Sequence, residues 1–157
     1  MRRMSGAERL PFVDELSVEV SAGEEAAWAG LLEVVDGMTS TAMGRTGARV
    51  LGCADTEGAG PRPLATGSSV PGFRVEEAEP PHRLALTGSH RFSHYALTFR
   101  VDGLGGGRAR VRAETRAEFP GPHGRAYRHL VIGTRGHVLA TRRVLAAVRR
   151  EAESPER

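Results

Sequence analysis

Hydrophobic and polar residues alternate over two separate segments of the chain. Leu16, Val18 and Val20 alternate with polar residues, and in the segment 108–119 five apolar or small residues alternate with Arg and Glu. A period of two is typical of a strand that buries one face and exposes the other. We therefore predict a strand at each of these two positions, with a charged and solvated outer face on the second.

Three further strand-like segments precede the second alternation and are separated by turn-like sequence. They cover residues 73–77, 83–90 and 95–102, and with 108–119 they predict four successive strands in an antiparallel meander. The glycine run at 103–107 lacks both the Lys-Ser/Thr pair and the following helix of a phosphate-binding loop. It is interpreted as a hairpin turn.

Two segments carry the period of a helix. The first is 23–36, where Ser21 is the expected N-cap and apolar residues recur at Ala27, Trp28, Leu31, Leu32 and Val35. The second is 124–152, which begins after the Pro120-Gly-Pro sequence and which we expect to form one long helix kinked or closely packed near Gly133 and Gly136.

The segment 44–72 is the least regular part of the chain. Arg49 to Cys53 is interpreted as a short strand, and the density of Gly and Pro between 56 and 72 leaves room for at most one more strand, near 64–70.

Length and composition favour one ordinary globular domain. The 157 residues are 39% hydrophobic and 26% charged, and no uninterrupted apolar run approaches the roughly 18 residues of a membrane span. We assign residues 12–152 to a single domain and expect 1–11 and 153–157 to be flexible termini. The lone Cys53 and the absence of a signal-peptide pattern favour a cytoplasmic protein without membrane insertion.

The charge pattern argues against a nucleic-acid partner. All 22 basic residues are Arg, yet the net charge is only +3 and basic residues alternate with acidic ones along 108–119. A nucleic-acid surface needs a sustained positive track and aromatic side chains for stacking. We interpret these arginines as a solvated surface.

The order of elements, a strand, a helical segment, a run of antiparallel strands and a long final helix, predicts an α+β fold. It resembles the helix-grip fold of the SRPBCC (START and Bet v 1-like) superfamily, including uncharacterised bacterial polyketide cyclase/dehydrase-like proteins. The resemblance is carried by PGFRVEEAEPPHRLALTGSHRFSHYALTFRVD, by RARVRAETRAEFPGPHGRAYRHLVIGTRGH and by the closing helix.

This resemblance implies a curved antiparallel sheet around the C-terminal helix, with an apolar cavity between them that binds a small hydrophobic molecule. The inward positions of the strands and of the final helix give the candidate ligand-binding residues, although the same positions would also suit a filled core. They are Leu86, His90, Tyr95, Leu97, Phe99, Val111, Thr115, Tyr127, Val131, Thr134, His137, Val138 and Thr141.

Two other functions stay open. In a cyclase- or aromatase-like enzyme, His90, Tyr95 or His137 would protonate a carbonyl oxygen of the substrate. In a protein–protein interaction module, Ile132 and Leu139 would contact a partner or a second copy of the chain, so that the protein would be a monomer or a homodimer. None of the six histidines has metal-ligand spacing, and no nucleophile elbow is present. We expect no metal and no cofactor, and the sequence identifies no catalytic residue.

Overall fold

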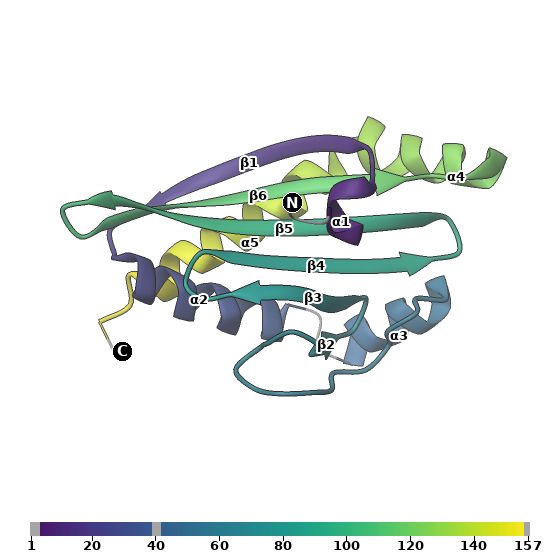
Figure 1. Ribbon diagram of the computed structural model, residues 1–157. Helices are drawn as coiled ribbons and strands as arrows, with labels where there is room; N and C mark the ends of the chain where they lie inside the picture. The colour runs from purple at the N-terminus through teal and green to yellow at the C-terminus, as the bar shows by residue number, and fades with distance from the viewer. Residues whose placement is uncertain (1–3, 39–41, 156–157) are drawn as a thin grey trace.

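The computed structural model describes residues 4–38 and 42–155 and is built around one antiparallel sheet with the strand order β1-β6-β5-β4-β3-β2 (Figure 1). The strands are β1 (Phe12–Val20), β2 (Ser69–Val70), β3 (Phe73–Glu79), β4 (Arg83–His90), β5 (Ser93–Gly105) and β6 (Arg108–Glu118). The helices are α1 (Gly6–Arg9), α2 (Glu24–Gly37), α3 (Ala42–Leu51), α4 (Gly121–Arg128), the π-helical turn η1 (His129–Gly133) and α5 (Gly136–Ala152). The predicted meander and the α+β class are confirmed.

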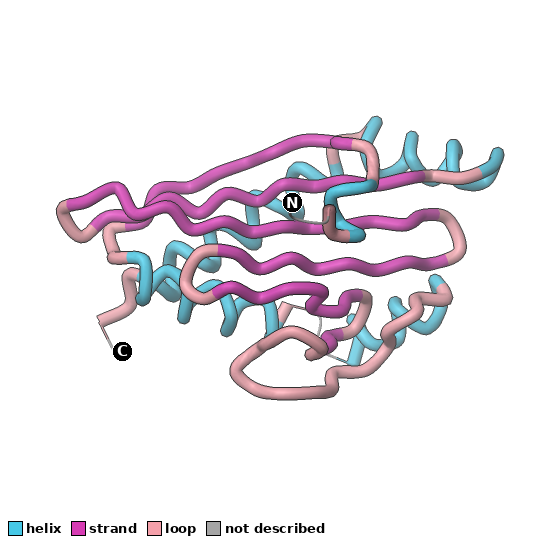
Figure 2. The backbone as a smooth tube through the Cα atoms, in the orientation of Figure 1, coloured by secondary structure: helices cyan, strands magenta, loops and turns pink. Residues whose placement is uncertain are grey.

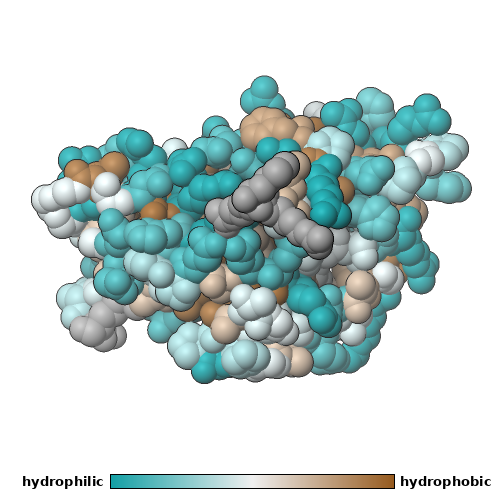
Figure 3. Space-filling model, in the orientation of Figure 1, coloured by the Kyte–Doolittle hydropathy of each residue, from teal (hydrophilic) through white to brown (hydrophobic). Residues whose placement is uncertain are grey.

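Helices α2 and α5 lie on one face of the sheet, and the short α1 lies on the other (Figure 1). The outer face is mostly hydrophilic, as the space-filling view shows (Figure 3). Its arginines pair with carboxylates of neighbouring strands, for example Arg108 and Arg110 with Glu19, and Arg112 with Asp102. These exposed pairs each contribute little to stability, but they keep the outer face solvated and free of a continuous positive track.

The packed core lies where α2 and α5 cross the inner face of the sheet. Leu31 of α2, Phe99 of β5 and Val148 of α5 are each fully buried there. Gly30 lets the two helices approach closely, because a Cβ atom at this position would lie 3.0 Å from the backbone nitrogen of Ala152. This end of the sheet is therefore filled by protein side chains.

The C-terminal helix is broken, which corrects the prediction of one helix over 124–152. Helix α4 ends at Arg128, η1 follows, and Arg135 adopts a left-handed conformation with φ 59° just before α5 begins. A π-helical turn holds one more residue than an α-helical turn, and a left-handed residue changes the direction of the chain. The inward-facing positions that were assigned by assuming one continuous helix therefore do not hold across this break.

The prediction of a strand at residues 49–53 is wrong. Residues up to Leu51 form α3, in which Ala48 and Leu51 lie one turn apart and Ala48 is buried. The expected strand near 64–70 shortens to the two residues of β2, within the long connection drawn as a loop in Figure 2. A short amphipathic helix interrupted by glycines has too few periodic positions to stand out from a strand.

The short helix α1, which precedes β1, is fixed to the sheet by hydrogen bonds. Ser5 and Glu8 form a capping box on α1, and the backbone amides of Gly6 and Ala7 donate to the carboxylate of Glu76 on β3. Residues 5–9 are thus held against the sheet, although the sequence placed them in a flexible terminus.

Ser21 does not cap α2, which is a second correction at this end of the sheet. The N-cap is Gly23, and no side chain caps the helix. The backbone amide of Ser21 donates instead to Glu153, at 2.7 Å, which ties the end of α5 to the β1–α2 connection.

No helix within residues 4–38 and 42–155 combines the length and the apolar character that crossing a membrane requires. The same described residues contain no group of three or more His, Cys, Asp or Glu side chains arranged to hold a metal ion.

Candidate functional site

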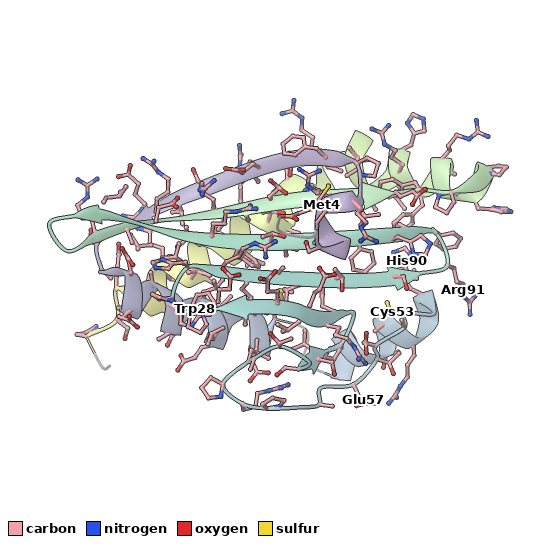
Figure 4. All side chains as sticks on the ribbon, viewed as in Figure 1. Met4, Trp28, Cys53, Glu57, His90 and Arg91 are labelled. Carbon is pink, nitrogen blue, oxygen red and sulfur yellow. The ribbon has the colours of Figure 1, made fainter. Side chains whose placement is uncertain are left out.

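A cavity of about 540 Å³ lies at the other end of the inner face, beyond the packed core. Its floor is formed by β5 and β6 together with the end of β4, and its walls come from α3, η1 and the first half of α5. His90, at the end of β4, and Cys53, just after α3, lie at this end of the molecule, whereas Trp28 lies toward the other end (Figure 4).

The cavity lies beyond the part of the sheet that α2 covers, since no residue of α2 is among the described residues that line it. At the packed end, Phe99 and the neighbouring Leu84 of β4 fill the space beneath the helices. At the cavity end, the floor combines Tyr95 and Leu97 of β5 with the shorter Thr115 and Ala117 of β6. Without α2 above them, these side chains do not fill the space up to the C-terminal helices to the density of a packed core.

Nine of the thirteen candidate residues line this cavity. They are His90, Tyr95, Leu97, Phe99, Thr115, Tyr127, Val131, His137 and Thr141. They come from three strands and from all three parts of the C-terminal helical segment.

The other four candidates lie outside the lining, for two reasons. Leu86 and Val111 are fully buried in the packed core, because their strands run on past the cavity. Thr134 is exposed and its hydroxyl bonds to the carbonyl of Leu130, and Val138 is half-buried outside the lining. Thr134 comes directly after η1 and Val138 after Arg135, so neither keeps the helical phase that one continuous helix would give.

Several lining residues were absent from the sequence-based set. They include Met38, Ala48, Leu51, Cys53, Phe73, Phe119, Ile132 and Val144. Ile132 belongs to the cavity instead of an outward surface, because η1 rotates it inward, while Leu139 is exposed. Two signals in the sequence could have added residues to the set: Phe119 lies on the same face of its strand alternation as Thr115, and Val144 lies on the apolar stripe of the final helix. The residues from α3 could not be found because α3 was not recognised as a helix.

One wall of the cavity is an aromatic cluster that joins the sheet to α4. The ring of Tyr127 lies edge-on to the ring of His90 at 4.9 Å and stacks on Phe92 at 5.4 Å between centroids. Tyr95 packs edge-on against Phe73 at 5.2 Å. Such geometries are favourable for aromatic pairs, and they give the cavity a rigid, ring-lined surface.

The hydroxyl of Tyr95 is committed to the protein. It donates to the backbone carbonyl of Gly72, at 2.5 Å, and lies 3.8 Å from the sulfur of Cys53. Gly88 makes room for this ring, since a Cβ atom there would overlap both the ring and the Gly72 carbonyl. Burial, and then the neighbouring Cys53, raises the pKa of Tyr95, so the phenol stays protonated and keeps donating.

His90 is held as a neutral ring. The backbone amide of Phe92 donates to its Nδ1 at 3.1 Å, so the proton is on Nε2, which donates to the hydroxyl of Ser93 at 3.2 Å. Burial lowers the pKa of His90, and the nearby His94 lowers it further. Protonation of Nδ1 would also break the bond to Phe92.

His137 marks the end of the cavity nearest β1. Its Nε2 lies 3.1 Å from Oδ1 of Asp14, which joins the first turn of α5 to the first strand. The hydroxyl of Thr141, one turn further on, donates to the carbonyl of His137 at 2.9 Å. Both side chains therefore have protein partners beside the cavity.

The order of strands, the helices on one face and the cavity beneath the C-terminal helix define a helix-grip fold, as the sequence predicted. No protein-family model and no curated protein sequence matches the chain. The likeness is to solved structures, and it concerns the fold.

Three of these structures illustrate the likeness. Truncated norcoclaurine synthase from Thalictrum flavum is 14% identical with a TM-score of 0.58, over 94% of this chain and 99% of that chain. The same enzyme in complex with dopamine and hydroxybenzaldehyde is 14% identical with a TM-score of 0.51, over 91% and 90%. The di-domain ARO/CYC BexL is 17% identical with a TM-score of 0.56, over 89% of this chain but 46% of that chain.

Proposed function

We propose that this protein binds a small, uncharged and largely apolar molecule in the cavity between the sheet and the C-terminal helices. The observation that carries the proposal is the charge of the lining: no Asp, Glu, Lys or Arg is among the described residues that form it. A charged ligand would lose its hydration there without gaining an ion pair, whereas a neutral ring system would gain contact with the aromatic wall. Cavities of this size and character are typical of small-molecule sites.

Binding is favoured over catalysis by the bonding of the polar lining groups. A general acid has to direct its proton at the substrate, but Tyr95 donates to Gly72, and the Nε2 proton of His90 is directed to Ser93. His137 is paired with Asp14. The cyclase-like alternative requires at least one of these bonds to break when a substrate enters.

Two fluorescent probes that differ in one charged group test the proposal. N-phenyl-1-naphthylamine is neutral, and 8-anilino-1-naphthalenesulfonate is its sulfonated analogue. We expect the neutral probe to bind at least about tenfold more tightly, because the sulfonate must be desolvated without a counter-charge. The protein carries a net charge of +3, so non-specific attraction would favour the sulfonate. Tighter binding of the sulfonate would contradict the proposal.

The neutral state of His90 predicts an acid-sensitive fold. The unfolded chain takes up a proton at this histidine near pH 6.5, about the ordinary value, whereas the folded chain does so only at lower pH. Between these two values the unfolded state binds more protons, so the free energy of unfolding falls as the pH falls below about 6.5. Denaturant titrations from pH 7.5 to 5.0 measure this slope.

A His90→Asn variant should show a shallower loss of stability over the same pH range. His123 on α4 is exposed, and the matched His123→Asn variant should keep the slope of the parent protein. Equal slopes in all three proteins would show that His90 is not held neutral by its surroundings.

A further inference from the structure

Among the described residues that line the cavity, Thr115 is the one whose side-chain polar atom is buried without a hydrogen-bond partner. It lies on the inner face of β6 and is 8% exposed. Its Oγ1 is buried and has no hydrogen-bond partner among the described residues. Other atoms of Thr115 border the cavity. A buried hydroxyl without a partner is destabilising, and such groups in folded proteins call for an explanation.

The neighbouring positions show that the strand does not need a hydroxyl here. The inner face of β6 continues with Ala113 on one side and Ala117 on the other, and the directly opposite residue on β5 is Leu97. Valine has nearly the same shape as threonine and would fit this apolar surface without an unmet donor. The hydroxyl therefore has no evident structural role in the unliganded protein.

The hydroxyl can reach the cavity by a rotation of its own side chain. Threonine has three staggered positions about χ1, and Oγ1 and Cγ2 occupy similar volumes. Rotation about χ1 from one staggered position to the next therefore moves Oγ1 to another side of the residue at little steric cost. Since Thr115 borders the cavity, a ligand atom placed against it can select the rotamer that directs the O–H inward.

We propose that the apolar ligand carries a carbonyl oxygen, and that this oxygen accepts a hydrogen bond from Thr115. The inference rests on the proposed function, because it concerns the same cavity. A carbonyl satisfies the unmet donor and brings no new donor that would itself need a partner. A carboxylate is disfavoured, because Asp14 lies directly opposite Thr115 on β1 and would repel it.

Fluorene and 9-fluorenone test this proposal, because they differ chiefly by the carbonyl group. Each compound is used to displace N-phenyl-1-naphthylamine from the parent protein and from Thr115→Val. For each protein, the affinity for fluorenone is divided by the affinity for fluorene. Comparing this ratio between the two proteins cancels the difference in hydrophobicity between the two compounds. We expect the preference for fluorenone to fall by about threefold to tenfold in Thr115→Val, the effect of one hydrogen bond.

Thr98→Val is the matched control. Thr98 is also buried in the sheet, but it lies on β5 between the lining residues Leu97 and Phe99, outside the lining. Its substitution should leave the fluorenone preference unchanged. In the absence of ligand, Thr115→Val should melt at the temperature of the parent protein or above it, since the unmet donor is removed.

The outcomes separate this inference from the proposed function. If both compounds bind but the ratio is the same in the parent and in Thr115→Val, the carbonyl contact is wrong and the apolar site stands. If neither compound displaces the probe and the probe itself does not bind, the proposed function fails, and this inference fails with it.

Discussion

An Ala117→Trp variant is expected to lose binding of N-phenyl-1-naphthylamine, with an increase in Kd of at least about 100-fold. Ala117 lies on the floor of the cavity, opposite Tyr95 on the neighbouring strand, and its side chain is short where the space is needed. An indole at this position occupies the volume in which the probe would make its apolar contacts, and most of the binding free energy comes from those contacts. Fluorescence titration gives the Kd directly.

Two further variants distinguish a filled cavity from a general loss of structure. Val131→Trp fills the cavity from the helical wall instead of the sheet and should have the same effect on binding. Ala146→Trp adds the same side chain to an exposed position of α5 and should leave the Kd unchanged. Overpacking costs roughly 1–3 kcal/mol, so circular dichroism should still show folded proteins. Tight binding by both cavity variants would place the site elsewhere.

A Phe99→Ala variant is expected to show the largest loss of stability, about 3–5 kcal/mol. Phe99 is fully buried where the packed core meets the cavity, so the space that it leaves cannot be closed by neighbours that already border a void. For a domain of this length the loss corresponds to a decrease in Tm of roughly 6–20 °C. Thermal and denaturant unfolding measure both quantities.

Phe12→Ala is the matched control for this experiment. The ring of Phe12 is 57% exposed and lies beneath the guanidinium of Arg116 at 5.7 Å. An exposed contact of this kind contributes about 1 kcal/mol or less. Similar losses in the two variants would mean that Phe99 is not part of the core.

The sheet could be predicted from the sequence because its signal is local. Each alternation on β1 and β6 contains enough positions to define a face, and the turns between strands are rich in Gly and Pro. The nine candidate residues that line the cavity were chosen from the inward positions of β4, β5 and β6 and from the phase of the final helix.

The rest of the site depends on features that have no local signal. The break between α4 and α5 consists of the π-helical turn η1 and the left-handed residue Arg135, and it places Ile132 in the lining and Thr134 outside it. The boundary between packed core and cavity depends on how α2 covers the strands. For this reason Leu86 and Thr115, which both face inward, have different surroundings.

The central claim is that a neutral apolar molecule occupies the space between β5, β6 and α5. Methyl NMR spectra recorded during titration with N-phenyl-1-naphthylamine test it most directly, because an aromatic ligand shifts the methyl resonances that it touches. We predict saturable shifts for Leu97, Val131 and Val144 in the cavity, and little change for Leu31 in the packed core. Shifts confined to the exposed Leu139, or no shifts at saturating probe, would contradict the account.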